Sequence, residues 1–142
     1  MSSINAPIDF LFQTVKTYSI LSRKFDGYLG GISLNEFIIL SYLEKSPESK
    51  MRRVDLAEKI GLTASGITRL LLPMEKIWLI QREKNEHDAR VSFVLIAPGG
   101  KRKLFEAMDR IEVLLQESFP SYESWRLENT TKVLQEIWQF MK

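Results

Sequence analysis

The chain has 142 residues and a formal net charge of +2 at pH 7, with 44% hydrophobic and 27% charged residues. This composition is typical of a single globular domain and excludes a disordered or fibrous chain. The sequence has no cysteine, no apolar run near the ~18 residues that cross a bilayer and no signal-peptide pattern, so we expect a cytoplasmic protein without disulfides or a membrane anchor.

Two helices are predicted before the centre of the chain. Apolar residues recur at spacings of three and four from Ile8 to Phe25, which is the pattern of an amphipathic helix, and this helix should stop at the glycines that follow. Ser33 and Glu36 have the spacing of a capping box. They predict the start of a second helix, which should end before Pro47.

Residues 54–69 predict two short helices joined by a tight turn. Ala57 is a small side chain for the position where two helices cross, and Gly61 is free to adopt a positive φ after the first helix. Ile67 is a branched core residue on the second helix. We expect helices over residues 57–60 and 64–77. Proteins bind duplex DNA with such a helix-turn-helix.

A β-hairpin and two further helices are predicted after this motif. Residues 79–84 and 91–97 have strand composition and flank a polar tip at residues 85–88, so they predict a hairpin, or wing. Pro98 should open a long helix that Pro120 closes, and a last helix should follow with apolar positions from Leu127 to Met141. The predicted fold class is mostly α with a small β-hairpin wing (α+β).

Charge is segregated along the chain. Residues 50–103 contain twelve Lys and Arg against six Asp and Glu, a net charge of +6, and the remaining residues contain eight against twelve, a net charge of −4. A charge run is often only a solvated surface. Because this one coincides with the helix-turn-helix, we interpret it as a surface that neutralises phosphates of double-stranded DNA.

Short segments of the central part carry a family resemblance. They are Val54-Asp-Leu-Ala57, Ile67-Thr-Arg-Leu70, Met74-Glu-Lys76, Leu79-Ile80, His87-Asp-Ala-Arg90 and Pro98-Gly-Gly100. With the order of the elements, they resemble the multiple antibiotic resistance regulator (MarR) family of winged helix-turn-helix transcription factors, over nearly the whole chain. The resemblance implies a sequence-specific DNA-binding regulator, a repressor that acts as a homodimer on a palindromic operator and needs no cofactor.

The resemblance also implies a domain organisation and two DNA contacts. A single domain would cover residues 1–142, with a DNA-binding lobe at about 34–100 and dimerisation helices at about 5–28 and 101–142. The start of the second helix of the motif would lie in the major groove, where Ser65 and Thr68 can donate to base edges or phosphates. In the wing, Arg90 would enter the minor groove, and Asp88 would orient Arg90 or the wing backbone. A narrow minor groove attracts arginine.

The candidate DNA-binding residues come from both contacts and from basic residues assigned to the phosphate backbone. They are Arg52, Arg53, Thr63, Ala64, Ser65, Gly66, Thr68, Arg69, Lys84, His87, Asp88 and Arg90. From the residues alone, alternatives stay open. Thr63 is explained as a helix cap, Arg69 as a solvated charge, and Asp88 with Arg90 as an ion pair of the turn.

Three residues depart from the family pattern. Trp78 stands where the family usually has glycine, and because tryptophan is costly at positive φ, we expect the chain to leave the helix differently there, with the indole buried. Pro73 lies inside the second helix of the motif, the predicted recognition helix. It lacks the N–H that would bond to the carbonyl of Arg69, so we expect a kink. Ala97 replaces a threonine N-cap, a loss of about 1 kcal/mol.

Large apolar residues are abundant at both ends of the chain. They are Ile4, Ile8, Phe10, Phe12, Phe119, Tyr122, Trp125, Trp138 and Phe140. They are either core residues or, as the resemblance implies, part of an intertwined homodimer that places two recognition helices ~34 Å apart. The resemblance further implies a small-molecule effector that relieves repression. Its candidate lining residues are equally explained as core, and they are Phe12, Tyr18, Phe37, Tyr42 and Met108.

Enzyme function is disfavoured by the sequence. His87, the single histidine, lies in the predicted wing tip, and there is no glycine-rich phosphate loop or paired carboxylate motif. As a metal ligand, His87 has only Glu86 and Asp88 beside it in the sequence, so we expect no metal site. The alternative function is a winged helix that binds another protein without specific DNA binding. A weak salt dependence of DNA binding would favour that alternative.

Overall fold

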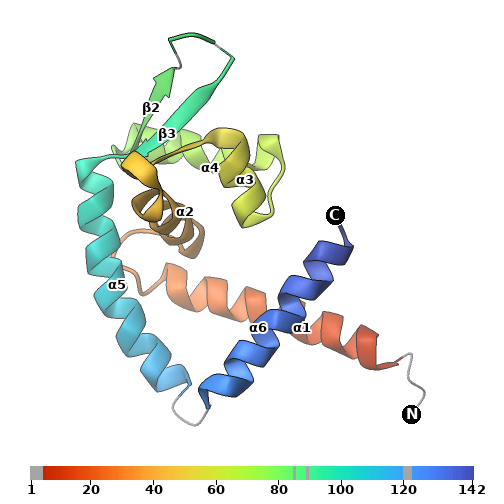
Figure 1. The fold of residues 1–142 in the computed structure, drawn as a ribbon. Helices are drawn as coiled ribbons and strands as arrows, with labels where there is room; N and C mark the ends of the chain where they lie inside the picture. The colour runs from red at the N-terminus through yellow and green to blue at the C-terminus, as the bar shows by residue number, and fades with distance from the viewer. Residues whose placement is uncertain (1–4, 85, 89, 120–122) are drawn as a thin grey trace. The chain divides into compact units, whose positions relative to one another are not determined.

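The computed structural model describes residues 5–84, 86–88, 90–119 and 123–142 (Figure 1). The described elements, in chain order, are α1 (Asn5–Asp26), α2 (Leu34–Lys45), the short 3₁₀ helix η1 (Pro47–Ser49), β1 (Lys50–Arg52), α3 (Arg53–Ile60), α4 (Ala64–Lys76), β2 (Ile80–Lys84), β3 (Ser92–Ile96), α5 (Pro98–Ser118) and α6 (Ser124–Phe140). The predicted fold class, mostly α with a small β part, is confirmed. Ile4, Tyr122, Ala89 and the predicted helix end at Pro120 lie outside the described residues.

The chain divides into two compact units, residues 1–111 and 112–142. The first contains the elements from α1 to β3 and most of α5, and the second contains α6. Among the residues that the structure describes, none of the helices is both long and apolar enough to cross a membrane.

The start of α2 is fixed by the predicted capping box. The Ser33 hydroxyl accepts a hydrogen bond from the Glu36 N–H at 3.1 Å, and the Glu36 carboxylate accepts one from the Ser33 N–H at 2.8 Å. The carboxylate of Asp26, at the end of α1, accepts a further bond from the Leu34 N–H at 2.7 Å. These bonds satisfy N–H groups that a helix start leaves without partners, so the turn between α1 and α2 is defined by local sequence.

The helix-turn-helix forms as the sequence predicts. Ala57 and Ile67 are buried between α3 and α4, and Gly61 ends α3 with φ at 82° while its N–H donates to the carbonyl of Ala57 at 2.9 Å. The first helix begins earlier than expected, at Arg53. The second continues past Pro73 as one element to Lys76, and the kink expected there stays a prediction.

The wing is part of a three-stranded antiparallel sheet with the order β1-β3-β2 among the described residues. The β2–β3 hairpin is confirmed, with Ile80 opposite Ile96 and Lys84 opposite Ser92, and in Figure 1 it extends beyond α3 and α4. Strand β1 was not predicted. It pairs with β3 through Lys50 to Arg52, immediately before α3.

The core of the first unit lies where α2, α3 and α4 pack against the inner ends of the strands. Along α4 the buried side chains recur at spacings of four and three, as the amphipathic pattern requires, and they are Ile67, Leu71 and Met74. Other fully buried residues are Leu29, Ile39, Leu40, Leu43, Leu56, Ile80 and Val94. Burial of each such side chain stabilises the fold by about 1.5–3 kcal/mol. Because the buried residues of α4 all lie on one of its faces, this face holds the helix in place.

Glycine at position 100 allows a close approach of α5 to the chain before β2. A Cβ atom built on Gly100 would lie 2.1 Å from the carbonyl oxygen of Leu79. That oxygen accepts a hydrogen bond from the Ala97 N–H at 3.0 Å, which joins the end of β3 to the start of β2. Pro98 is the first residue of α5, as predicted. A side chain at position 100 would therefore push α5 away from the wing.

Trp78 corrects one expectation. It adopts a left-handed conformation with φ at 64°, and the residue is 73% exposed, so the indole is not buried. The Trp78 N–H donates to the Glu75 carbonyl at 3.2 Å and the Leu79 N–H donates to the Met74 carbonyl at 3.0 Å, the two bonds of a Schellman helix end. Met74 and Leu79 are both buried. Burial of these two neighbours, at about 1.5–3 kcal/mol each, exceeds the cost of about 1–2 kcal/mol for a positive φ at Trp78.

Candidate nucleic-acid interface

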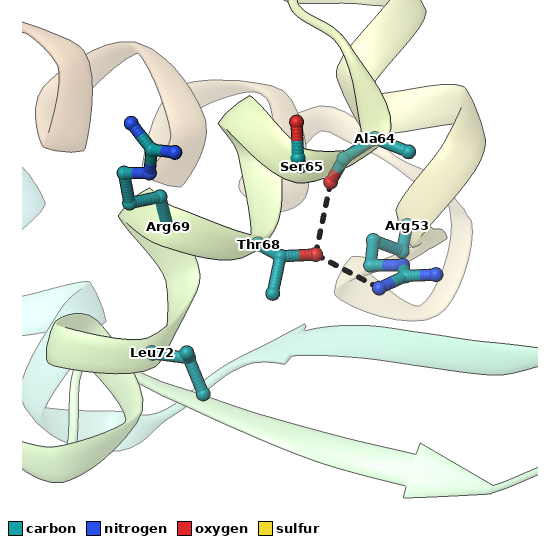
Figure 2. A pocket seen from close by; sticks show the side chains of 6 residues that line it. All are labelled: Arg53, Ala64, Ser65, Thr68, Arg69 and Leu72. Carbon is teal, nitrogen blue, oxygen red and sulfur yellow. Dashed lines mark hydrogen bonds between the residues drawn. The ribbon is translucent and has the colours of Figure 1, made fainter.

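The face of α4 opposite its buried side chains is open to solvent. Ser65, Arg69 and Leu72 are exposed and Thr68 is partly exposed, at the three- and four-residue spacings that place side chains on one helix face. With Ala64 and with Arg53 of α3, they line a shallow groove (Figure 2). The structure thus brings together six groove residues, five of which are predicted DNA-binding residues. Leu72 was missed, although its position four residues after Thr68 could have indicated it.

The N-terminus of α4 is capped by Thr63. Its hydroxyl accepts from the Gly66 N–H at 3.1 Å and lies 3.3 Å from the Ser65 hydroxyl. A Cβ atom at Gly66 would lie 3.1 Å from the same Thr63 oxygen, so glycine keeps this turn compact. The role of Thr63 as a cap is therefore confirmed. A capped helix start also carries the positive end of the helix dipole, which favours an anion.

Thr68 has a different set of contacts from those expected. Its hydroxyl donates its single proton to the Ala64 carbonyl at 2.9 Å and accepts a hydrogen bond from Nη1 of Arg53 at 2.8 Å. Figure 2 shows the guanidinium of Arg53 directed at this hydroxyl across the groove. Thr68 thus has no second proton for a base or phosphate in this arrangement. The bond instead joins the first residue of α3 to the recognition helix.

The charges near this face fall into two groups. Among the described residues, no carboxylate lies within ion-pair distance of Arg53, Arg69 or Lys84, and all three side chains are exposed. Arg82, in contrast, pairs with Glu75 at 2.8 Å. Lys50 pairs with Glu48 at 3.1 Å and with Glu83 at 3.2 Å, and these carboxylates raise its pKa. Three exposed cations without an ion pair to a described residue therefore lie at the start of α3, on α4 and at the end of β2.

Asp88 and Arg90 form the predicted contact in the wing. The Asp88 carboxylate accepts from the Arg90 backbone N–H at 3.0 Å and from Nε at 3.1 Å. These hydrogen bonds lower the pKa of Asp88, so its carboxylate stays charged until the pH falls below the usual range for aspartate. The side chain of Arg90 is nevertheless 91% exposed. The turn ion pair is therefore present, and it holds a guanidinium that faces solvent.

The remaining predicted wing and backbone residues are exposed. Arg52 is the last residue of β1, His87 lies beside Asp88, and Lys84 ends β2. Among the described residues, no group of three or more His, Asp and Glu side chains is placed to hold a metal ion.

Four of the five effector candidates line two separate hollows of the single chain. Phe37, Tyr42 and Met108 line an open, mainly apolar cavity of about 520 Å³ between α2 and α5, together with Ile38, Leu104 and Phe105. Tyr18 lines a separate hollow beside the start of α2. Phe12 lies on the exposed face of α1, with 65% of its surface accessible, and Tyr18 is 57% exposed. The core explanation therefore does not hold for Phe12 or Tyr18 in the single chain.

These features define a winged helix-turn-helix protein. Residues 32–92 of the chain match the model of the MarR family. Members of this family are transcriptional regulators and not enzymes. No curated protein matches the chain.

Solved structures agree with the fold. The chain is similar to AbsC, a MarR family transcriptional regulator from Streptomyces coelicolor, with 20% identity, a TM-score of 0.83 and coverage of 99% of this chain and 96% of that one. It is similar to Sco3205 from the same organism, a MarR family regulator solved in complex with DNA, with 18% identity, a TM-score of 0.83 and coverage of 96% and 89%. The transcriptional regulator BldR from Sulfolobus solfataricus is 27% identical, with a TM-score of 0.77 and coverage of 96% and 99%.

Proposed function

We propose that this protein is a sequence-specific regulator that binds double-stranded DNA through α4 and the wing. The observation that carries the proposal is the two-sided character of α4. Its apolar face is buried, and its opposite face carries Ser65, Arg69 and Leu72 beside the cation of Arg53. A similar fold has been solved with DNA in Sco3205. Small and polar side chains on a solvent-exposed helix of this diameter suit the major groove.

In this proposal, the DNA-binding residues divide by role. Ala64, Ser65, Gly66 and Arg69 lie over base edges, and Thr63 at the helix start faces a phosphate. Arg52, Lys84 and His87 contact the backbone, and Arg90 enters the minor groove under the control of Asp88. The hydrogen bonds between Asp88 and Arg90 support this last role, because they restrict the direction of an otherwise exposed side chain.

Selection from a random duplex library followed by binding across salt concentrations tests this function. The proposal expects one enriched motif, and it expects the logarithm of affinity to fall linearly with the logarithm of salt concentration, by about 0.9 for each neutralised phosphate. Absence of an enriched motif together with a flat salt response would contradict it. That outcome would favour the winged-helix protein-binding module.

The proposal includes a homodimer on a palindromic site. In α1, Leu11, Phe12 and Val15 are each more than half exposed, and in α6 Trp125 is 57% and Phe140 is 92% exposed. Apolar surface of this extent on both flanking helices is a reason to expect a second copy there. Sedimentation should give a dimer that Val15→Glu shifts toward monomer, while Lys16→Glu, a charge change at a neighbouring exposed position, should not.

Repression and its relief by an effector complete the proposal. A dimer bound at an operator can exclude the transcription machinery, and a ligand with different affinities for two dimer geometries would shift their populations. The cavity between α2 and α5 is the supporting observation. Anilinonaphthalene sulfonate is a suitable apolar probe: its fluorescence should rise with the wild type, and Met108→Trp, which fills the cavity, should reduce the rise. An equal rise in both proteins would argue against a ligand there.

A further inference from the structure

We propose that Thr68 is a positioning residue, which holds the guanidinium of Arg53 so that Arg53 binds the O6 and N7 edge of a guanine. The inference rests on the proposed DNA-binding function and assigns a role that reverses the expectation from sequence. The sequence predicts Thr68 as a direct donor to DNA and Arg53 as a contact to the phosphate backbone.

The first step concerns the hydroxyl of Thr68. It donates to the Ala64 carbonyl, one helical turn earlier, and its oxygen accepts from Arg53 Nη1. A hydroxyl has one proton, so its capacity to donate is fully used within the protein, and Arg53 occupies one of its two acceptor lone pairs. In this geometry the side chain of Thr68 has no proton left to donate to DNA in the groove.

The second step concerns Arg53. A guanidinium has five N–H donors, and one of them is directed at Thr68. The others have no hydrogen-bond partner among the described residues, and Arg53 lines the same groove as Ser65 and Arg69. Because Arg53 begins α3, directly after its neighbour Arg52 pairs in the sheet, its backbone is fixed at the edge of the recognition face.

The third step is why this arrangement suits a base and not only a phosphate. A phosphate attracts any nearby cation, and a mobile side chain serves it well. Bidentate binding of guanine needs a planar fork held in one orientation. The hydrogen bond to the Thr68 hydroxyl restrains the plane of the Arg53 guanidinium. The same hydroxyl could otherwise donate to DNA directly. The restraint is therefore a device for specificity.

Three variants test the inference on the duplex selected with the wild type and on a random duplex. Thr68→Val keeps the β-branched shape and removes the hydroxyl, Thr68→Ser restores the hydroxyl, and Arg53→Ala removes the guanidinium. Arg53→Ala should reduce the preference for the selected site roughly 5- to 150-fold, the range of one bidentate base contact. Thr68→Val should reduce the same preference, Thr68→Ser should recover most of it, and Thr68→Val should add nothing in the Arg53→Ala background.

A chemical probe identifies the base. Replacing single guanines of the selected site by 7-deazaguanine removes the N7 acceptor, and at one position it should weaken the wild type and leave Arg53→Ala unaffected. Melting temperatures equal to that of the wild type establish that each variant is folded. We expect this equality because the hydrogen bond between Arg53 and Thr68 is exposed to solvent.

Several results would overturn the inference. They are a Thr68→Val protein with wild-type preference, an equal loss of affinity on every sequence, additive effects of Thr68→Val and Arg53→Ala, or insensitivity of the wild type to 7-deazaguanine at all positions. If the wild type itself selects no duplex, the proposed function fails and this inference fails with it. If the wild type selects a site and Thr68→Val binds like the wild type, only the inference fails.

Discussion

Replacing Gly100 by alanine is expected to destabilise the first unit, because the structure leaves no room for a Cβ atom there. The added atom would lie 2.1 Å from the Leu79 carbonyl oxygen, 3.0 Å from Ile96 Cγ1 and 3.1 Å from Leu40 Cδ2. Relief requires α5 to retreat by roughly 1 Å, which costs about 1–3 kcal/mol for overpacking. The retreat also strains the hydrogen bond from Ala97 to Leu79, a contribution of about 1 kcal/mol.

The expected loss is therefore about 2–4 kcal/mol, or a fall in melting temperature on the order of 6–12 °C for a chain of this length. Thermal unfolding followed by circular dichroism measures it, with all proteins at one protomer concentration because dimerisation would shift the midpoint. Gly27→Ala is the matched control. A Cβ atom there meets nothing nearer than 3.8 Å, so its melting temperature should stay close to that of the wild type. A Gly100→Ala protein that melts with the control would show that α5 moves aside freely, and the reasoning would be wrong.

Three further predictions concern exposed residues. Trp78→Gly should raise stability by about 0.5–1 kcal/mol, since it removes the strain of a positive φ and loses little burial; a lower melting temperature would contradict the strain argument. Arg90→Ala should weaken DNA binding and leave the melting temperature within a degree or two, because its side chain is 91% exposed; a marked fall would assign it a structural role. Leu72→Ala should reduce discrimination between thymine and deoxyuridine in the selected site by roughly fourfold, the value of one buried methyl group, and unchanged discrimination would remove Leu72 from the base-reading surface.

Features with a local sequence signal were predictable from the sequence. The capping box of Ser33 and Glu36, the helix-turn-helix glycine at position 61 and the β2–β3 hairpin all appear where local chemistry indicated. Strand β1 could not be predicted, since three residues are too few for an alternating pattern and the strand exists only through pairing with β3. Tertiary contact supplied what the local sequence lacked.

Trp78 and Thr68 show the limit of residue-by-residue reasoning. The burial of Met74 and Leu79 on either side determines the conformation of Trp78, which therefore adopts a positive φ that is unfavourable for tryptophan. The proposed role of Thr68 depends on its hydrogen bond with Arg53, fifteen residues earlier. No spacing pattern in the sequence predicts that bond. In the same way, Phe37, Tyr42 and Met108 meet in one cavity while Phe12 and Tyr18 do not, because only the packing of α2 on α5 selects among apolar residues.

Arg52 has two structural positions at once, and this has a mechanical consequence. It is the last residue of β1, opposite Phe93 of the wing, and it is also the N-cap of α3. In the part of the chain that the structure describes, β1 leads directly into α3, so in the proposed complex the fold sets the distance between the wing and the helices. A duplex whose grooves do not match that distance must bend or narrow to fit. The protein would then rank operators partly by stiffness at base pairs it never touches.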